Sequence, residues 1–195
     1  GLGDVYKRQG MYCNALVTAG LSDAKVTVVG PFDISGTSAL VGAMKAYSVM
    51  TGEEISEKTM DTATDELVTT AEVAKNVGDK QKVTELVAAA KKAVFEDQLS
   101  SETDIRDAIE QAANELSIDL SDDDVEKLTN MMMKVSKEDI DPDTIAKQAS
   151  DIYNKLKEKG IDLANVDTKG LGEKIGDFFG NIFTAIANFF SGLFG

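Results

Sequence analysis

Apolar side chains recur at helical spacing through much of this 195-residue chain, and this pattern is the strongest constraint on its fold. Five segments between residues 53 and 160 carry apolar residues three and four positions apart, and each is bounded by a residue that suits a helix terminus. The clearest of them follows Asp79 and contains Val83, Leu86, Val87, Ala90 and Val94. The sequence therefore predicts a mainly α fold whose centre is a helical domain at 53–160.

The other four helices are predicted to begin near Asp61 and at Ser101, Ser121 and Asp141. The first of them should stop at Gly78, and the last should begin with Pro142 in its first turn and end before Gly160. The helix near Asp61 has the predicted apolar face Leu67, Val68, Ala71, Ala74 and Val77, and the helix at Ser101 has Ile105, Ile109, Ala112 and Leu116. The helix at Ser121 has Val125, Leu128, Met132 and Val135, and the helix at Asp141 has Ile145, Ala149, Ile152, Tyr153 and Leu156. Met131, Met132 and Met133 are interpreted as part of this core.

The N-terminal part has a different pattern. Residues 1–10, GLGDVYKRQG, show no consistent period and are interpreted as a non-native leader. Residues 11–52 are interpreted as a truncated α/β remnant: a helix that Gly20 ends, one short strand at 25–29 (KVTVV), and a helix at 38–50. The last helix has the predicted face Leu40, Val41, Met44, Tyr47 and Met50.

Composition excludes several classes of chemistry. The chain has no histidine, so Ser-His-Asp and Cys-His nucleophiles and histidine-ligated metals cannot form within it. Its one cysteine, Cys13, rules out an internal disulfide and is expected to be a small buried hydrophobe. A net charge of −14 argues against binding nucleic acid through phosphates. We expect no catalytic residues, no cofactor and no metal.

Three blocks of sequence carry a resemblance to a known family. They are KVTVVGPFDISGTSALVGAMKAYSVMTGEEI at 25–55, IDLSDDDVEKLTNMMMKVS at 118–136 and QASDIYNKL at 148–156. In this order they resemble the YpuA-like family of predicted exported proteins from Gram-positive bacteria, which has no assigned function. The resemblance implies an extracellular or cell-envelope location and, because members have a signal sequence and an upstream segment, a chain truncated at its N-terminus. It supplies no site residues.

Few residues are candidates for ligand chemistry. The segment 30–38, GPFDISGTS, lies between the predicted strand and helix and lacks the lysine of a phosphate-binding loop. Ser35, Thr37 and Ser38 are weak candidates for holding a small anion, with helix capping as the favoured interpretation. Two sets of alternating acids, which begin at Asp119 and Asp139, lack the glycine and glutamate of a calcium loop. Most acids are interpreted as solvated or as helix-start residues.

The last 23 residues hold the most informative functional pattern. After a loose linker at 161–172, an amphipathic Phe-rich helix is predicted at 173–195. Its apolar residues follow one another at intervals of 3, 1, 3, 1, 3, 3, 1, 3 and 1 and form a single stripe. The stripe consists of Ile175, Phe178, Phe179, Ile182, Phe183, Ile186, Phe189, Phe190, Leu193 and Phe194. Asp177 and two asparagines interrupt the segment, so it is not a transmembrane span.

These ten side chains are expected to need a partner, because full burial stabilises each by ~1.5 to 3 kcal/mol. A membrane surface is the first hypothesis, docking on the chain's own helical domain the second, and a homo-oligomer the third. The predicted function is accordingly an extracytoplasmic, envelope-associated, non-enzymatic protein that binds a membrane surface or a partner helix through its tail. The alternative is a soluble ligand-binding or protein-interaction module with the tail docked.

Overall fold

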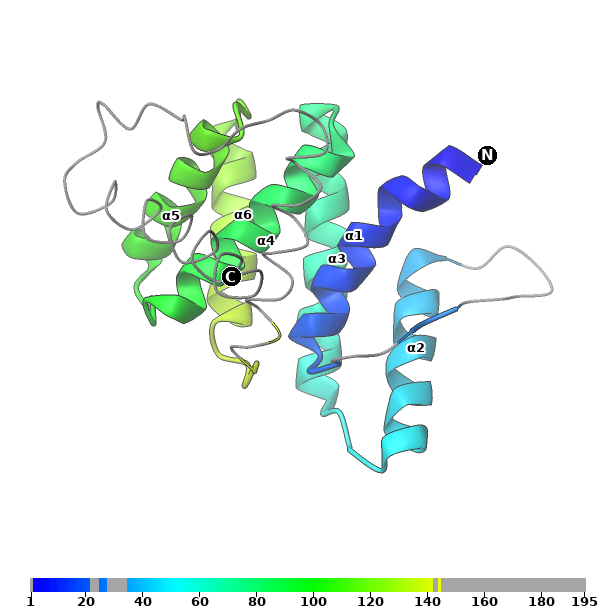
Figure 1. The fold of residues 1–195 in the computed structure, drawn as a ribbon. Helices are drawn as coiled ribbons and strands as arrows, with labels where there is room; N and C mark the ends of the chain where they lie inside the picture. The colour runs from blue at the N-terminus through cyan, green and yellow to red at the C-terminus, as the bar shows by residue number, and fades with distance from the viewer. Residues whose placement is uncertain (1, 22–24, 28–34, 142–143, 145–195) are drawn as a thin grey trace, which may run out of the picture. The chain divides into compact units, whose positions relative to one another are not determined.

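The structure is a computed structural model that describes residues 2–21, 25–27, 35–141 and 144, all within one unit, Gly1–Ala149. These residues form six α-helices and no strand (Figure 1). The helices are α1 (Leu2–Thr18), α2 (Gly36–Thr51), α3 (Glu57–Val77), α4 (Lys80–Glu96), α5 (Glu102–Glu115) and α6 (Asp122–Val135). The prediction of a mainly α chain is confirmed for this part.

Capping residues set several helix boundaries as the sequence predicts, although α3 begins at Glu57 after the N-cap Ser56, four residues before the predicted start near Asp61. The side chains of Asp79, Ser101 and Ser121 accept hydrogen bonds from backbone N–H groups in the first turns of α4, α5 and α6. Gly52 and Gly78 end α2 and α3 with φ of 77° and 81°, a left-handed conformation that glycine adopts without steric cost. Short connections therefore separate the four consecutive helices α3, α4, α5 and α6.

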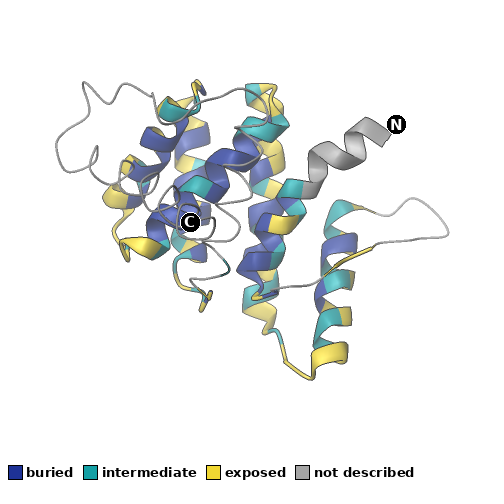
Figure 2. Ribbon diagram, viewed as in Figure 1, coloured by how far each residue is buried: buried dark blue, intermediate teal, exposed yellow. Residues whose placement is uncertain are grey.

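Helices α3 and α4 form the centre of this unit. α3 packs against α1, α2, α4 and α6, and α4 packs against α1, α3, α5 and α6 (Figure 1). Figure 2 shows α4 buried over most of its surface. The five residues predicted for its apolar face, Val83, Leu86, Val87, Ala90 and Val94, are at most 2% exposed. The prediction for α4 is confirmed.

Two predicted apolar faces are partly wrong. On α3, Val68 and Ala71 are exposed, and the buried face instead includes Thr62, Glu66 and Thr70. On α2, Leu40 and Met44 are buried, but Met50 is 84% exposed. The error on α3 has a physical cause. Polar side chains occupy core positions on this helix, so the apolar residues alone indicate a face that is rotated away from the buried one.

The expected α/β remnant is not confirmed. Residues 25–27 are not a strand, and Val26 is 42% exposed; residues 28–29 lie outside the described part. A strand needs a partner for its backbone hydrogen bonds, and no partner strand occurs among the described residues. The predicted helix at 11–20 is found, but α1 begins at Leu2 and so includes most of the expected leader.

Three predicted segments lie almost wholly outside the described residues. They are the helix from Asp141 to 159, the linker at 161–172 and the amphipathic helix at 173–195. At the edge of the described part, the Asp141 carboxylate accepts a hydrogen bond from the Thr144 backbone N–H at 2.9 Å. This is the bond that an N-cap residue makes. None of the described helices has the length and apolar character to cross a bilayer.

Candidate functional site

Ser35, Thr37 and Ser38, the candidate anion-binding residues, lie at the start of α2. Ser35 is its N-cap, and its hydroxyl accepts a hydrogen bond from the Ser38 backbone N–H at 3.1 Å. The Ser35 hydroxyl also donates to the Ser38 hydroxyl at 2.8 Å and lies 3.1 Å from that of Thr37. The hydroxyl groups are thus engaged with one another in a cap, and anion binding stays a prediction. The ten residues of the tail stripe lie outside the described part.

Two of the acidic residues in the sets singled out from sequence, Asp124 and Asp141, make hydrogen bonds at helix starts. Asp124 is buried, and its carboxylate accepts hydrogen bonds from the Ser121 hydroxyl at 2.7 Å and from the Asn76 amide at 2.8 Å. Within the described ranges, no three acidic or cysteine side chains gather as a metal site would require. Cys13 is exposed, so its expected burial is wrong: it lies on α1 beside Asn14, which faces the core.

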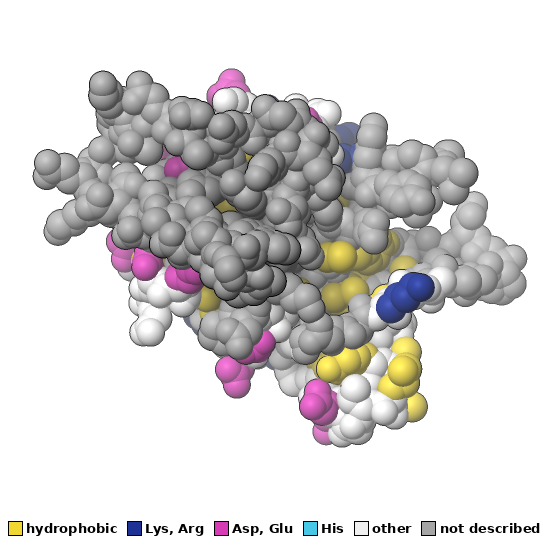
Figure 3. Space-filling model, in the orientation of Figure 1, with side chains coloured by type: hydrophobic (Ala, Val, Ile, Leu, Met, Phe, Trp, Pro, Cys, Tyr) yellow, Lys and Arg dark blue, Asp and Glu magenta, His cyan; other side chains and the backbone are white. Residues whose placement is uncertain are grey.

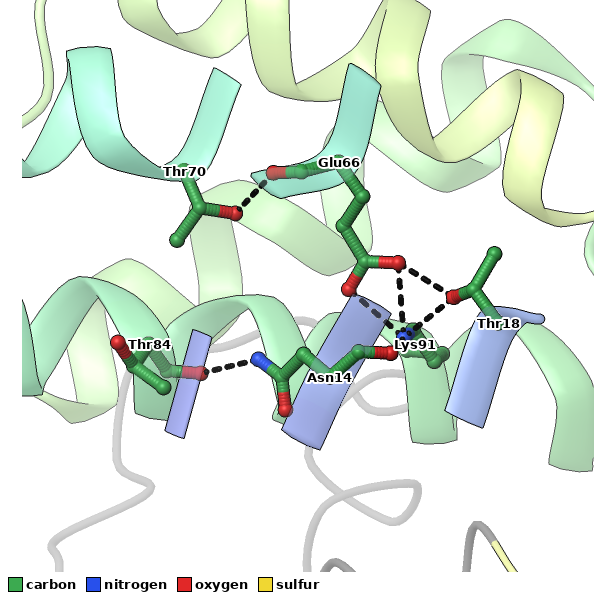
Figure 4. A network of polar contacts seen from close by, with 6 residues as sticks. All are labelled: Asn14, Thr18, Glu66, Thr70, Thr84 and Lys91. Carbon is green, nitrogen blue, oxygen red and sulfur yellow. Dashed lines mark hydrogen bonds and ion pairs between the residues drawn. The ribbon is translucent and has the colours of Figure 1, made fainter. Parts of the chain in front are cut away.

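The most unusual chemistry of the unit lies in its core, where α1, α3 and α4 meet (Figure 4). Asn14 and Thr18 are one helical turn apart on α1 and are both buried. Glu66 comes from α3 and Lys91 from α4, and neither of these two side chains has exposed surface. All four residues belong to one hydrogen-bonded cluster.

Lys91 is the centre of this cluster. Its Nζ donates to the two carboxylate oxygens of Glu66 at 2.7 and 3.0 Å. It also donates to the backbone oxygen of Asn14 and to the hydroxyl of Thr18, both at 2.7 Å. The ammonium group has three protons and four acceptors, so the two Glu66 oxygens share one proton between them. No donor of Lys91 is left over.

The remaining polar groups of the cluster are also paired. The Thr18 hydroxyl donates to Oε2 of Glu66, and the Asn14 side-chain amide donates to the backbone oxygen of Thr84 at 3.0 Å. The Thr70 hydroxyl donates to the backbone oxygen of Glu66 at 2.7 Å. A buried charge is tolerated when its partners are complete, and the partners of Lys91 on α4 come from two other helices, α1 and α3.

Burial shifts the pKa of Lys91. Removal from water lowers the pKa of Lys91, and the negative charge and hydrogen bonds of Glu66 oppose this shift without cancelling it. A lysine of lowered pKa has the chemistry of a nucleophile or base, but here the side chain has no exposed surface. The cluster therefore positions α1 on α3 and α4, and we assign it no reaction.

Glu115, outside this cluster, also has a shifted pKa. It is half-buried at the last residue of α5, and burial raises its pKa to about 7. A hydrogen bond with Gln111, one turn earlier and itself buried, acts against the shift. This carboxyl group changes charge near neutral pH, whereas an ordinary glutamate does so near pH 4.5.

The buried cluster was missed in the sequence, although a signal was present. Lys91 lies four residues after Val87 and three before Val94, so it falls on the apolar stripe of α4. Glu66 directly precedes Leu67 in a helix rich in small and apolar residues. A lone acid and a lone base in the apolar stripes of two successive helices are a pattern that predicts a buried ion pair.

Comparison with known proteins gives the family. Residues 7–152 match the family described as protein of unknown function (DUF1002), which is more than half of the chain. The chain belongs to this DUF1002 family. It is also 37% identical over 182 residues to the uncharacterized protein YpuA of Bacillus subtilis (strain 168). The resemblance to a YpuA-like family of unknown function is thereby confirmed.

The match leaves part of the relative uncovered. It includes 92% of this chain but 61% of YpuA, so the chain spans about three fifths of that relative's length. The DUF1002 match begins at residue 7, inside the segment that the sequence pattern marks as a leader. No solved structure matches the chain.

Proposed function

We propose that this chain is part of an extracytoplasmic, envelope-associated protein that binds a membrane surface through residues 173–195. The observation that carries the proposal is the stripe of ten large apolar side chains, six of them phenylalanine, on one face of the predicted helix. If half of that stripe were covered, about 10 kcal/mol of hydrophobic free energy would still favour burying it. A segment with this pattern needs an apolar surface to lie on.

The charge of the segment favours a neutral bilayer. Glu173 and Asp177 outweigh Lys174, so residues 173–195 have a net charge of −1. Attraction to anionic lipid needs clustered Lys and Arg, which are missing here. Apolar insertion is then the driving force, as in amphipathic helices that lie in the interface plane.

The proposal is tested by sedimentation of the full chain with zwitterionic phosphatidylcholine vesicles. We expect the chain to pellet with vesicles and the double variant Phe183→Ser, Phe190→Ser to pellet at least tenfold less, since each lost phenylalanine removes a large apolar area. The matched control changes two asparagines on the opposite face, Asn181→Ser and Asn188→Ser, and should pellet like the unchanged chain. Equal pelleting of both double variants would contradict the proposal.

The same variants distinguish membrane binding from the alternative of a docked tail in a soluble module. If the tail lies on the chain's own helices, the phenylalanine variant lowers the thermal midpoint without vesicles and the unchanged chain stays in the supernatant. If the tail binds membranes, the thermal midpoint in the absence of lipid is the same for both double variants.

The location outside the cytoplasmic membrane is proposed from the resemblance to predicted exported proteins. It is tested in cells that produce the full-length protein, by adding protease to intact cells. Loss of the protein, with a cytoplasmic marker retained, is the expected result. Full protection until the cells are lysed would contradict an extracytoplasmic location.

A further inference from the structure

Helix α2 has a composition that differs from the rest of the described unit. Its 16 residues, GTSALVGAMKAYSVMT, contain no acidic side chain, and Lys45 is its one charged residue. Each of the other five described helices contains at least one acid. The chain has 34 acidic residues, so a helix without any of them, such as α2, differs clearly from its neighbours.

The outward side of α2 is apolar as well as the inward side. Ala39, Leu40 and Met44 are buried. On the other side Gly42 and Ala46 are exposed, and Val49 and Met50 are 86% and 84% exposed, the highest values among the large hydrophobic side chains of the described residues. Figure 2 shows this exposure toward the end of α2, and Figure 3 shows hydrophobic side chains on the surface there.

A surface helix ordinarily places polar side chains on its solvent side. On α2 the exposed residues between the first and last turns are small or apolar apart from Lys45, and the polar exposed residues Ser38 and Thr51 lie in those end turns. A stable interface with another protein takes about 20–30 residues from each partner, far more than this face provides. A lipid surface has no such requirement, because each inserted apolar side chain adds to membrane affinity separately.

We propose that the outward face of α2, centred on Val49 and Met50, is a second membrane contact that acts together with the C-terminal stripe. The inference rests on the proposed membrane function of the chain. The face has no carboxylate that lipid phosphates would repel, and Lys45 can extend its ammonium group to those phosphates. Glu53 and Glu54 are exposed just after the C-cap Gly52, so the contact is shallow and leaves both carboxylates in water.

The absence of tryptophan from the chain permits a site-specific test. Three full-length variants each carry one tryptophan, Val49→Trp, Met50→Trp or Val68→Trp, and are mixed with phosphatidylcholine vesicles. Val68 is the matched control, a valine 38% exposed on α3. The expected result is a blue shift of tryptophan emission at positions 49 and 50 and unchanged emission at 68.

A second measurement gives the size of the effect. The double variant Val49→Ser, Met50→Ser should bind vesicles roughly tenfold more weakly than the unchanged chain, and Val68→Ser should bind equally well. Because all of these positions are exposed, the variants are expected to fold. Circular dichroism spectra that match the unchanged chain confirm this.

The outcomes separate this inference from the proposed function. If the variants pellet with vesicles but the emission of Trp at 49 and 50 does not shift, the α2 contact is overturned and the tail proposal stands. If no variant pellets, both are overturned. A blue shift without lipid, accompanied by a dimeric mass, would assign the face to a second copy of the chain and overturn the lipid contact.

Discussion

Nζ of Lys91 lies 2.7 Å from Oε1 of Glu66, and neither side chain has any exposed surface. A buried ion pair of this kind adds little net stability, because the cost of removing both charges from water offsets their attraction. Removing one partner lowers stability strongly, because a single buried charge then remains without its counter-charge. The pair therefore makes the core of this unit sensitive to change at either residue.

The first prediction concerns this pair. Lys91→Met should lower the free energy of unfolding by about 3–5 kcal/mol, because the Glu66 carboxylate is left buried and uncompensated. The double variant Glu66→Gln, Lys91→Met should recover most of this loss. Urea unfolding of both variants and of Glu66→Gln alone measures the coupling. Additive losses in the three variants would contradict a direct interaction.

The second prediction concerns the attachment of α1. Thr18→Val removes the hydroxyl that donates to Glu66 and accepts from Lys91, and should cost about 1–3 kcal/mol because a buried charged donor loses an acceptor. Hydrogen exchange of the α1 amides should accelerate in this variant. Thr18→Ser keeps the hydroxyl and is the control. If serine and valine accelerate exchange equally, the hydroxyl has no such role.

The third prediction compares two glycines. A Cβ at Gly10 would lie 2.6 Å from Cγ2 of Thr84. Thr84 can turn away only by giving up its 2.7 Å hydrogen bond to the Lys80 backbone oxygen, so Gly10→Ala should destabilise by about 1 kcal/mol. Gly42→Ala adds a Cβ into open space within α2 and should stabilise by about 0.5–1 kcal/mol. Thermal unfolding of both variants should show midpoint shifts of opposite sign.

The fourth prediction is a dependence of stability on pH. The folded-state pKa of Glu115 is about 7 and its ordinary value is 4.5, so the folded chain binds more protons between these values and Glu115 costs stability as pH rises through that window. After allowance for solvent screening, Glu115→Gln should stabilise by roughly 1 kcal/mol at pH 8 and by almost nothing at pH 4. The exposed Glu110 of the same helix provides the control, Glu110→Gln. A gain from Glu115→Gln that is equal at both pH values would contradict the shift.

Helix termini were the part of the fold that sequence predicted best. Asp79, Ser101 and Ser121 act locally, through hydrogen bonds to N–H groups two or three residues further on. The glycines at 52 and 78 also act locally, since their left-handed backbone ends a helix wherever it occurs. Such signals do not depend on the rest of the chain.

The buried cluster was harder to predict because its partners come from three helices. The local sequence marks Glu66 as a core residue only by its place beside Leu67, and its burial depends on Lys91 from a helix that is itself surrounded by others. For the same reason the predicted buried face of α3 included Val68, whereas the residues that are buried include Glu66 and Thr70. The strand at 25–29 was predicted from its β-branched residues. This composition alone does not determine a strand, and the described residues contain no partner strand.

The first helix completes a core that the other helices leave unfinished. Two of the four acceptors around Lys91 come from Asn14 and Thr18, so a chain that starts after Thr18 contains a buried ammonium group without its full shell. With respect to the other five described helices, α1 acts as a bound peptide that is covalently joined to them. A synthetic peptide of the α1 sequence should therefore bind such a shortened chain and raise its thermal midpoint in proportion to the logarithm of peptide concentration, as a ligand does.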